Sequence, residues 1–124
     1  MKRLIGVVAL AAGLLIALPL GTVTDAHASS ISRAQAVRKA KEYLQFEAFS
    51  KKGLAQQLKF EGFSTSDANY GASHSGANWM KQAVRKAREY LQMEAFSRQS
   101  LMEQLEFEGF THAQALHGAR AVGL

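Results

Sequence analysis

Four histidines are the first side chains to consider for metal or acid–base chemistry, and their spacing favours neither. His27 lies near the N-terminus, His74 lies in a Gly/Ser-rich stretch, and His112 and His117 are five positions apart. Two metal ligands on one helix face are spaced by about one turn, and the chain has no cysteine to complete a site. The sequence therefore predicts neither a metal nor a cofactor.

Carboxylates and serines recur along the chain in positions that indicate structural roles. The recurring carboxylates are Glu47, Glu61, Glu94 and Glu108. A duplication explains their recurrence, and nothing pairs them in an apolar pocket, as acid–base catalysis requires. Ser50 and Ser97 fit the starts of helices better than a nucleophilic role. Because a glycine-rich phosphate-binding loop is also missing from the sequence, we expect no catalytic residues and no enzymatic activity.

Lysines and arginines cluster in two equivalent stretches and are the candidate partner-binding residues. They are Arg38, Lys39, Lys41, Lys51 and Lys52 in the first stretch, and Arg85, Lys86 and Arg88 in the second. The formal net charge is +5, yet charges of both signs are mixed along the chain, which is typical of a solvated surface. A protein partner, an anionic wall polymer and a membrane surface are the functional alternatives for these basic faces.

DNA binding is a further alternative that the sequence disfavours. Residues 64–71 and 111–118, where a recognition helix would lie, contain no lysine or arginine. Binding to the DNA backbone depends on such side chains, and an exported protein meets little operator DNA. We therefore expect no nucleic-acid partner.

The elements that carry all these residues form a tandem repeat. The segment at 36–45 returns at 83–92, an offset of 47 residues, and the match runs without a gap to the end of the unit. The segments at 47–50 and 60–63 return in the same way at 94–97 and 107–110. A match this dense indicates a duplication.

Each copy is predicted to form three short helices. Ala36, Val37, Ala40, Tyr43 and Leu44 fall on one arc of a helical wheel, which indicates an amphipathic first helix. The expected helices lie near 32–46, 50–61, 64–71, 79–93, 97–108 and 111–120. The sequence thus predicts an all-α fold of two tandem three-helix, helix-turn-helix-like units.

Capping residues predict where the helices begin and end. Ser50 and Ser97 are N-caps, each flanked by a phenylalanine that can staple onto a leucine inside the helix. Gly62 and Gly109 suit the left-handed residue that ends a helix in a Schellman motif. Capping boxes are expected at the third helices, from Ser64 with Asp67 and from Thr111 with Gln114.

The chain divides into four segments on this interpretation. Residues 1–28 are a signal peptide, 29–72 are the first unit, 73–78 are a Gly/Ser linker, and 79–124 are the second unit. Trp79, at the far edge of the linker, is expected to pack on the second unit or between the units, with an exposed partner anchor as the alternative.

The N-terminal segment predicts export. Lys2 and Arg3 precede an apolar run that ends at Pro19 and Gly21, and the small residues around Ala28 form a cleavage site. A membrane span usually needs about 20 apolar residues, and this run is shorter. We expect cleavage after Ala28 and a secreted or wall-associated protein.

The repeated motifs resemble those of the Ltp-type host cell surface-exposed lipoproteins. The motifs are Ala-x-x-Tyr-Leu, Ala-Phe-Ser, Leu-x-x-Gln-Leu and Phe-Glu-Gly-Phe-Ser/Thr, and residues 76–79 are similar to the join between the units of that family. The resemblance covers residues 32–119. It implies a fold of two helix-turn-helix-like bundles.

The same resemblance implies a function in superinfection exclusion. It implies a non-enzymatic binding module outside the bacterial membrane that blocks DNA injection by an incoming phage through a phage-tail protein. Members of the family carry a lipid-modified cysteine, whereas this sequence contains none. We therefore expect a released protein, and a structural protein of the cell wall that binds anionic polymer is the alternative.

Overall fold

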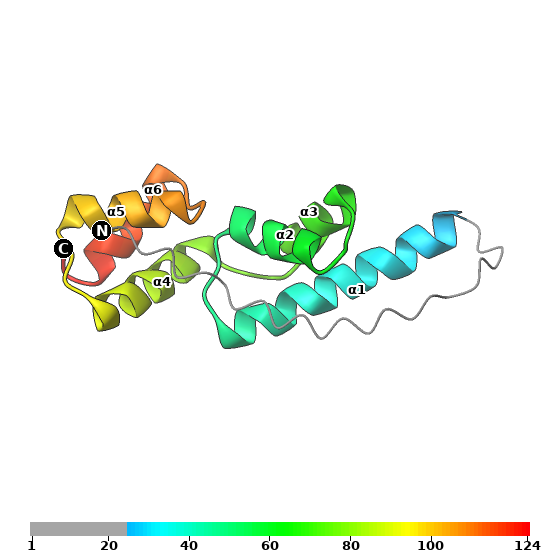
Figure 1. The fold of residues 1–124 in the computed structure, drawn as a ribbon, viewed down its shortest axis with the longest axis horizontal. Helices are drawn as coiled ribbons and strands as arrows, with labels where there is room; N and C mark the ends of the chain where they lie inside the picture. The colour runs from blue at the N-terminus through cyan, green and yellow to red at the C-terminus, as the bar shows by residue number, and fades with distance from the viewer. Residues whose placement is uncertain (1–24) are drawn as a thin grey trace.

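Residues 25–124 form six α-helices and no strand in a computed structural model of the protein (Figure 1). In chain order the helices are α1 (Asp25–Phe46), α2 (Lys51–Phe60), α3 (Thr65–Ser73), α4 (Trp79–Met93), α5 (Arg98–Phe107) and α6 (His112–Ala121). Side chains are described from residue 30 onward, and the predicted signal peptide at 1–28 lies outside them.

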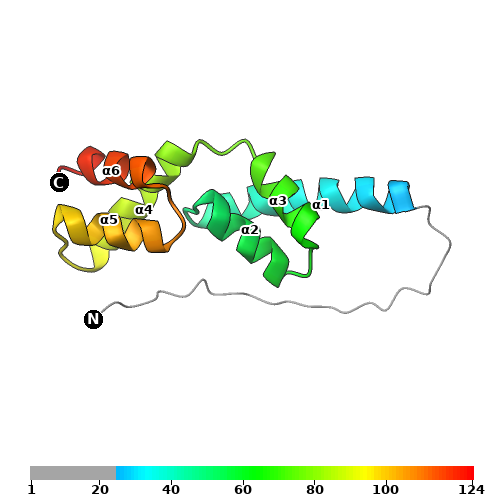
Figure 2. The same cartoon turned by 90° about the horizontal axis from the view of Figure 1, so that it is seen from above.

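The helices form two units, as predicted. Helices α1, α2 and α3 pack together as unit 1, and α4, α5 and α6 as unit 2. The units lie one beyond the other along the long axis, with α1 and α4 running in the same direction (Figures 1 and 2). The predicted all-α fold with two three-helix units is confirmed for residues 25–124.

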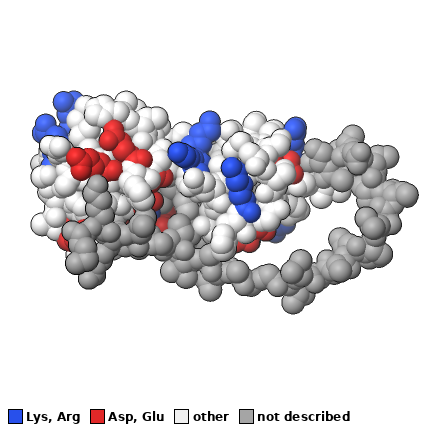
Figure 3. Space-filling model, turned by 45° about the horizontal axis from the view of Figure 1, so that its top comes forward, with Lys and Arg blue, Asp and Glu red and all other residues white. Residues whose placement is uncertain are grey.

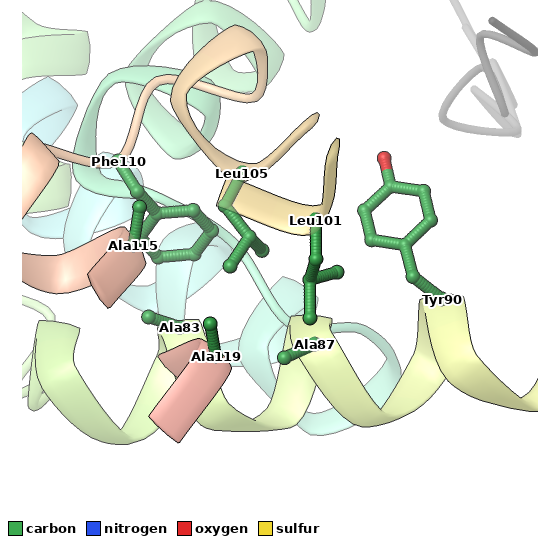
Figure 4. Packing of buried hydrophobic residues seen from close by; sticks show 8 residues of the cluster. All are labelled: Ala83, Ala87, Tyr90, Leu101, Leu105, Phe110, Ala115 and Ala119. Carbon is green, nitrogen blue, oxygen red and sulfur yellow. The ribbon is translucent and has the colours of Figure 1, made fainter. Parts of the chain in front are cut away.

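Each unit has its own small core, built from a few leucines and many alanines. The core of unit 2 brings α4, α5 and α6 together around Leu101, Leu105 and Phe110 (Figure 4). The core of unit 1 contains the equivalent Leu54, Leu58 and Phe63. Alanines fill the helix crossings because they let the helix backbones approach closely, and four of them are fully buried, Ala36 and Ala40 in α1 and Ala83 and Ala87 in α4.

Two helix boundaries differ from prediction. The described part of helix α1 begins at Asp25 and not near residue 32, because residues 25–31 include no proline or glycine that would stop a helix. Helix α3 continues to Ser73, past the expected end at Gly71 and into the predicted linker. Gly71 lies where α3 crosses α1, and a Cβ there would be 2.8 Å from the Ala36 carbonyl oxygen. This glycine serves close packing and not helix termination.

The predicted caps are formed. Ser50, Ser97, Ser64 and Thr111 each accept a hydrogen bond from the backbone three residues on. Gly62 and Gly109 have φ angles of 102° and 104°, and each belongs to a Schellman pair of backbone hydrogen bonds. The caps therefore set the sharp turns that separate the helices in both units.

The expected capping box at Ser64 is wrong in one detail. The Asp67 carboxylate does not return the bond to Ser64 but accepts from the Ser32 hydroxyl at 2.6 Å and lies 3.8 Å from Arg33. It therefore links α3 to α1. The Thr111–Gln114 capping box is confirmed, and Ser97 forms a further one with Ser100.

Candidate partner-binding surface

The loop between α1 and α2 docks on α4, and this contact joins the two units. Backbone N–H groups of Ala48 and Phe49 donate to Glu89 and Gln82 of α4, at 3.2 and 3.3 Å. In return, Arg85 donates to the Leu44 carbonyl oxygen at 3.0 Å. Polar side chains of α4 thus satisfy backbone groups in the last turn of α1 and in the loop that follows it.

An ion pair lies inside this contact. The Lys86 ammonium is 3.1 Å from Glu47 of unit 1 and 3.1 Å from Glu89 of its own helix. Its side chain is only 9% exposed, and it lies over the Phe49 ring. A lysine this buried needs such partners, because a buried charge left unpaired is strongly destabilising.

A second part of the contact depends on close backbone approach. The Ser50 hydroxyl donates to the Glu108 carbonyl oxygen at 2.5 Å. A Cβ on Gly53 would lie 3.3 Å from that same oxygen, and one on Gly109 would lie 2.7 Å from the Ser50 hydroxyl. Trp79 adds apolar contact by packing on the core of unit 1. It therefore lies between the units, which was one of its two expected positions.

The eight predicted basic residues fall into two groups. Arg38, Lys41, Lys51, Lys52 and Arg88 are exposed and Lys39 is half-buried. Arg85 and Lys86 lie in the inter-unit contact. Lys86 is buried there, so it is not part of a solvated basic face. Lys39, its equivalent in unit 1, pairs with Glu42 at 3.3 Å and its side chain is 40% exposed. Equal residues therefore have unequal roles in the two units.

A groove crosses the junction between the units beside two of the exposed lysines. It encloses about 440 Å³. Its lining residues are Lys51, Lys52, Ala55, Asn69, Ala72, Ser73, Gly109, Thr111 and Gln114, and they include no acidic side chain. On the face shown in Figure 3, basic side chains lie over the middle of the molecule and acidic ones gather on unit 2. The groove is a candidate site for an anionic group.

Large apolar side chains are exposed at equivalent places in the two units, and sequence reasoning missed them. Phe46 and Phe60 of unit 1 are 85% and 65% exposed, and their equivalents Met93 and Phe107 are 54% and 63% exposed. The sequence did contain a signal for them, because apolar residues outside the buried helix face recur at the repeat offset. These exposed side chains are candidate contacts for a protein partner.

A hydrogen-bonded tyrosine, partly buried in unit 1 and buried in unit 2, lies near each exposed pair. Tyr43 donates to Glu61 and Tyr90 to Glu108, and Gln57 and Gln104 donate to the respective tyrosines. Burial and the hydrogen bond to the glutamate raise the pKa of both phenols, so they stay protonated donors at neutral pH. The bonds tie the ends of α2 and α5 to α1 and α4, next to Phe60 and Phe107.

In the part of the chain from residue 25 onward, no helix is both long and apolar enough to cross a membrane. The same residues contain no group of three histidines or carboxylates arranged to hold a metal ion.

The fold defines the class of protein: it is a small all-helical tandem repeat, and its two units are copies of each other. The sequence profile of the host cell surface-exposed lipoproteins matches residues 32–74 and again residues 78–119, one match for each unit. The chain belongs to this family, and the predicted resemblance is confirmed. Comparison with curated proteins and with solved structures found no match.

Proposed function

We propose that this protein is an exported, non-enzymatic binding module that excludes superinfecting phage by engaging a phage-tail protein and blocking DNA injection. Its membership of a family of surface-exposed proteins supports a place of action outside the cell. A protein partner there must bind folded side chains on a preformed surface, since both units are closed around their own cores.

The observation that carries the proposal is the repeated exposed apolar pair. Phe46 follows Tyr43 by three residues at the end of α1, and Phe60 directly precedes Glu61 at the end of α2, so each lies beside one partner of the Tyr43–Glu61 hydrogen bond. Met93 and Phe107 have the same relation to Tyr90 and Glu108. Burial of a phenylalanine against a partner contributes about 2 kcal/mol, and two equivalent sites on one molecule strengthen binding further through multivalency.

Expression in a phage-sensitive host tests the proposal. We expect phage DNA entry to fall while adsorption stays unchanged, because the protein acts after attachment. The paired variant Phe60→Ser/Phe107→Ser should weaken protection by about tenfold or more, since loss of about 1.4 kcal/mol of binding already gives tenfold. Intracellular phage DNA and unadsorbed phage are measured in the same infection.

A matched control separates loss of the surface from loss of the fold. Met80→Ser removes an apolar side chain that is 40% exposed and belongs to neither tyrosine hydrogen bond, and it should leave protection unchanged. All variants should keep their stability within about 0.5 kcal/mol, as exposed substitutions usually do. Normal DNA entry in cells that export the wild-type protein would contradict the proposal.

The groove at the junction supports a second candidate function, binding of an anionic wall polymer. Lys51 and Lys52 line it without an opposing carboxylate, and this charge suits repeated phosphates. The protein should then be retained on isolated cell walls at low salt and released as salt screens the charges. Lys51→Gln/Lys52→Gln should reduce retention, whereas Arg120→Gln, at a residue that does not line the groove, should not; equal loss with both variants would rule out this site.

A further inference from the structure

The contact between the units joins two different surfaces, one from each unit. Each unit also carries the surface that the other unit contributes, and that second surface is not used in the contact. We call the first surface the tip, residues 44–50 in unit 1 and 91–97 in unit 2. The second surface is the seat, formed by one face of a long helix and the following Schellman turn. In unit 2 the seat consists of Gln82, Arg85, Lys86, Glu89, Glu108 and Gly109.

The unused tip and seat carry the same residues as the used ones. Leu44, Glu47, Ala48, Phe49 and Ser50 correspond to Leu91, Glu94, Ala95, Phe96 and Ser97. The seat residues in unit 2 correspond to Gln35, Arg38, Lys39, Glu42, Glu61 and Gly62. Every one of these positions has the same amino acid in both copies, so the unused pair can form the same hydrogen bonds and the same ion pair.

Both unused surfaces are accessible. Ala95 and Ser97 are exposed and Phe96 is half-buried, whereas their equivalents in unit 1 are buried. A Cβ on Gly62 would meet no atom within 4 Å, although one on Gly109 would meet Ser50 and Lys52. The internal contact uses the tip of unit 1 and the seat of unit 2, so it covers neither the seat of unit 1 nor the tip of unit 2.

We propose that a second copy of this chain docks head to tail, with the tip of unit 2 on the seat of unit 1 of the next molecule. Glu94 then pairs with Lys39, as Glu47 pairs with Lys86, and the Ser97 hydroxyl donates to the Glu61 carbonyl oxygen. The two surfaces are different and lie on different units, so the contact is heterologous and adds further copies in the same direction.

Two substitutions between the copies make this contact weaker than the internal one. Ser100 stands where unit 1 has Gly53, and its Cβ occupies the place that is 3.3 Å from the facing carbonyl oxygen. Its hydroxyl also holds that of Ser97 at 2.9 Å. In addition, Ser32 replaces Trp79, which adds apolar contact in the internal case. A short linker gives the internal contact an effective concentration in the millimolar range. The association between molecules should therefore need protein concentrations near that range.

Analytical ultracentrifugation of the exported protein up to about millimolar concentration tests the proposal. We expect reversible association that Ser100→Gly strengthens by about tenfold, because it restores the glycine of the internal contact. Lys39→Glu and Glu94→Lys should each weaken association by about tenfold, and the double variant should recover it, since opposite charges again face each other. Arg120→Glu makes the same change in net charge as Lys39→Glu but lies outside the tip and the seat, so it should have no effect.

Three results would overturn the proposal. The first is a monomer at all concentrations for both the wild type and Ser100→Gly. The second is association that Lys39→Glu and Glu94→Lys leave unchanged. The third is a double variant that associates no better than either single variant, because the two residues then do not face each other.

Discussion

Gly71→Ala lowers the free energy of unfolding by about 2 kcal/mol, although alanine is the better helix former by about 1 kcal/mol. The new methyl group would lie 2.8 Å from both the carbonyl carbon and the carbonyl oxygen of Ala36. These are backbone atoms in the middle of α1, so they cannot move aside as the end of a flexible side chain can. The two helices must separate, and the buried alanines between them lose contact.

Urea unfolding measures this effect, and the chain offers two comparisons. Gly118→Ala should behave in the same way, because its methyl group would lie 2.9 Å from the Ala83 carbonyl oxygen. Ser66→Ala, at an exposed position of α3, should instead raise stability by a few tenths of a kcal/mol through helix propensity alone. A Gly71→Ala variant more stable than the wild type would show that α1 and α3 do not cross at this point.

Glu47→Lys separates the two units and lowers the free energy of unfolding by about 2 kcal/mol. The substitution places a second positive charge beside Lys86, whose side chain is 9% exposed and cannot turn freely to water. The partial exposure of Glu47, 32%, keeps the expected loss below that of a fully buried pair. Glu89 still pairs with Lys86, so helix α4 itself should remain intact.

The repeat supplies the matched control for this variant. Glu94→Lys makes the same change in the equivalent loop, but the side chain there is exposed and touches no seat within the molecule. At concentrations where the protein is monomeric, its stability should stay within about 0.5 kcal/mol of the wild type. Equal destabilisation by the two variants would mean that the loop, and not the inter-unit contact, responds to the charge.

Most of the fold could be predicted because its determinants are local. The caps at Ser50 and Ser97 and the turns at Gly62 and Gly109 each act over a few residues, and the sequence spacing shows them directly. The boundary at Gly71 was missed because a glycine that ends a helix and a glycine at a helix crossing look the same in sequence. Asp67 was misassigned for a similar reason, since its partners Ser32 and Arg33 are distant in sequence.

The candidate site could be predicted only in part, because the repeat gives identical residues different surroundings. Lys39 and Lys86 have the same neighbours in sequence, yet the Lys39 side chain is 40% exposed and that of Lys86 is buried between the units. The differences between the copies were the only sequence signal for the contact. Gly53 in place of Ser100 and Trp79 in place of Ser32 both lie where unit 1 meets unit 2.

The most direct test of this account is the distance between the units in solution. The groove, the self-association and the effect of Glu47→Lys all require the tip of unit 1 to rest on the seat of unit 2. Since the chain has no cysteine, spin labels can be placed uniquely at the exposed positions Ser66 of α3 and Gln99 of α5. We predict one narrow distance distribution in the wild type that Glu47→Lys broadens. A wild-type distribution as broad as that of the variant would contradict a fixed arrangement of the two units.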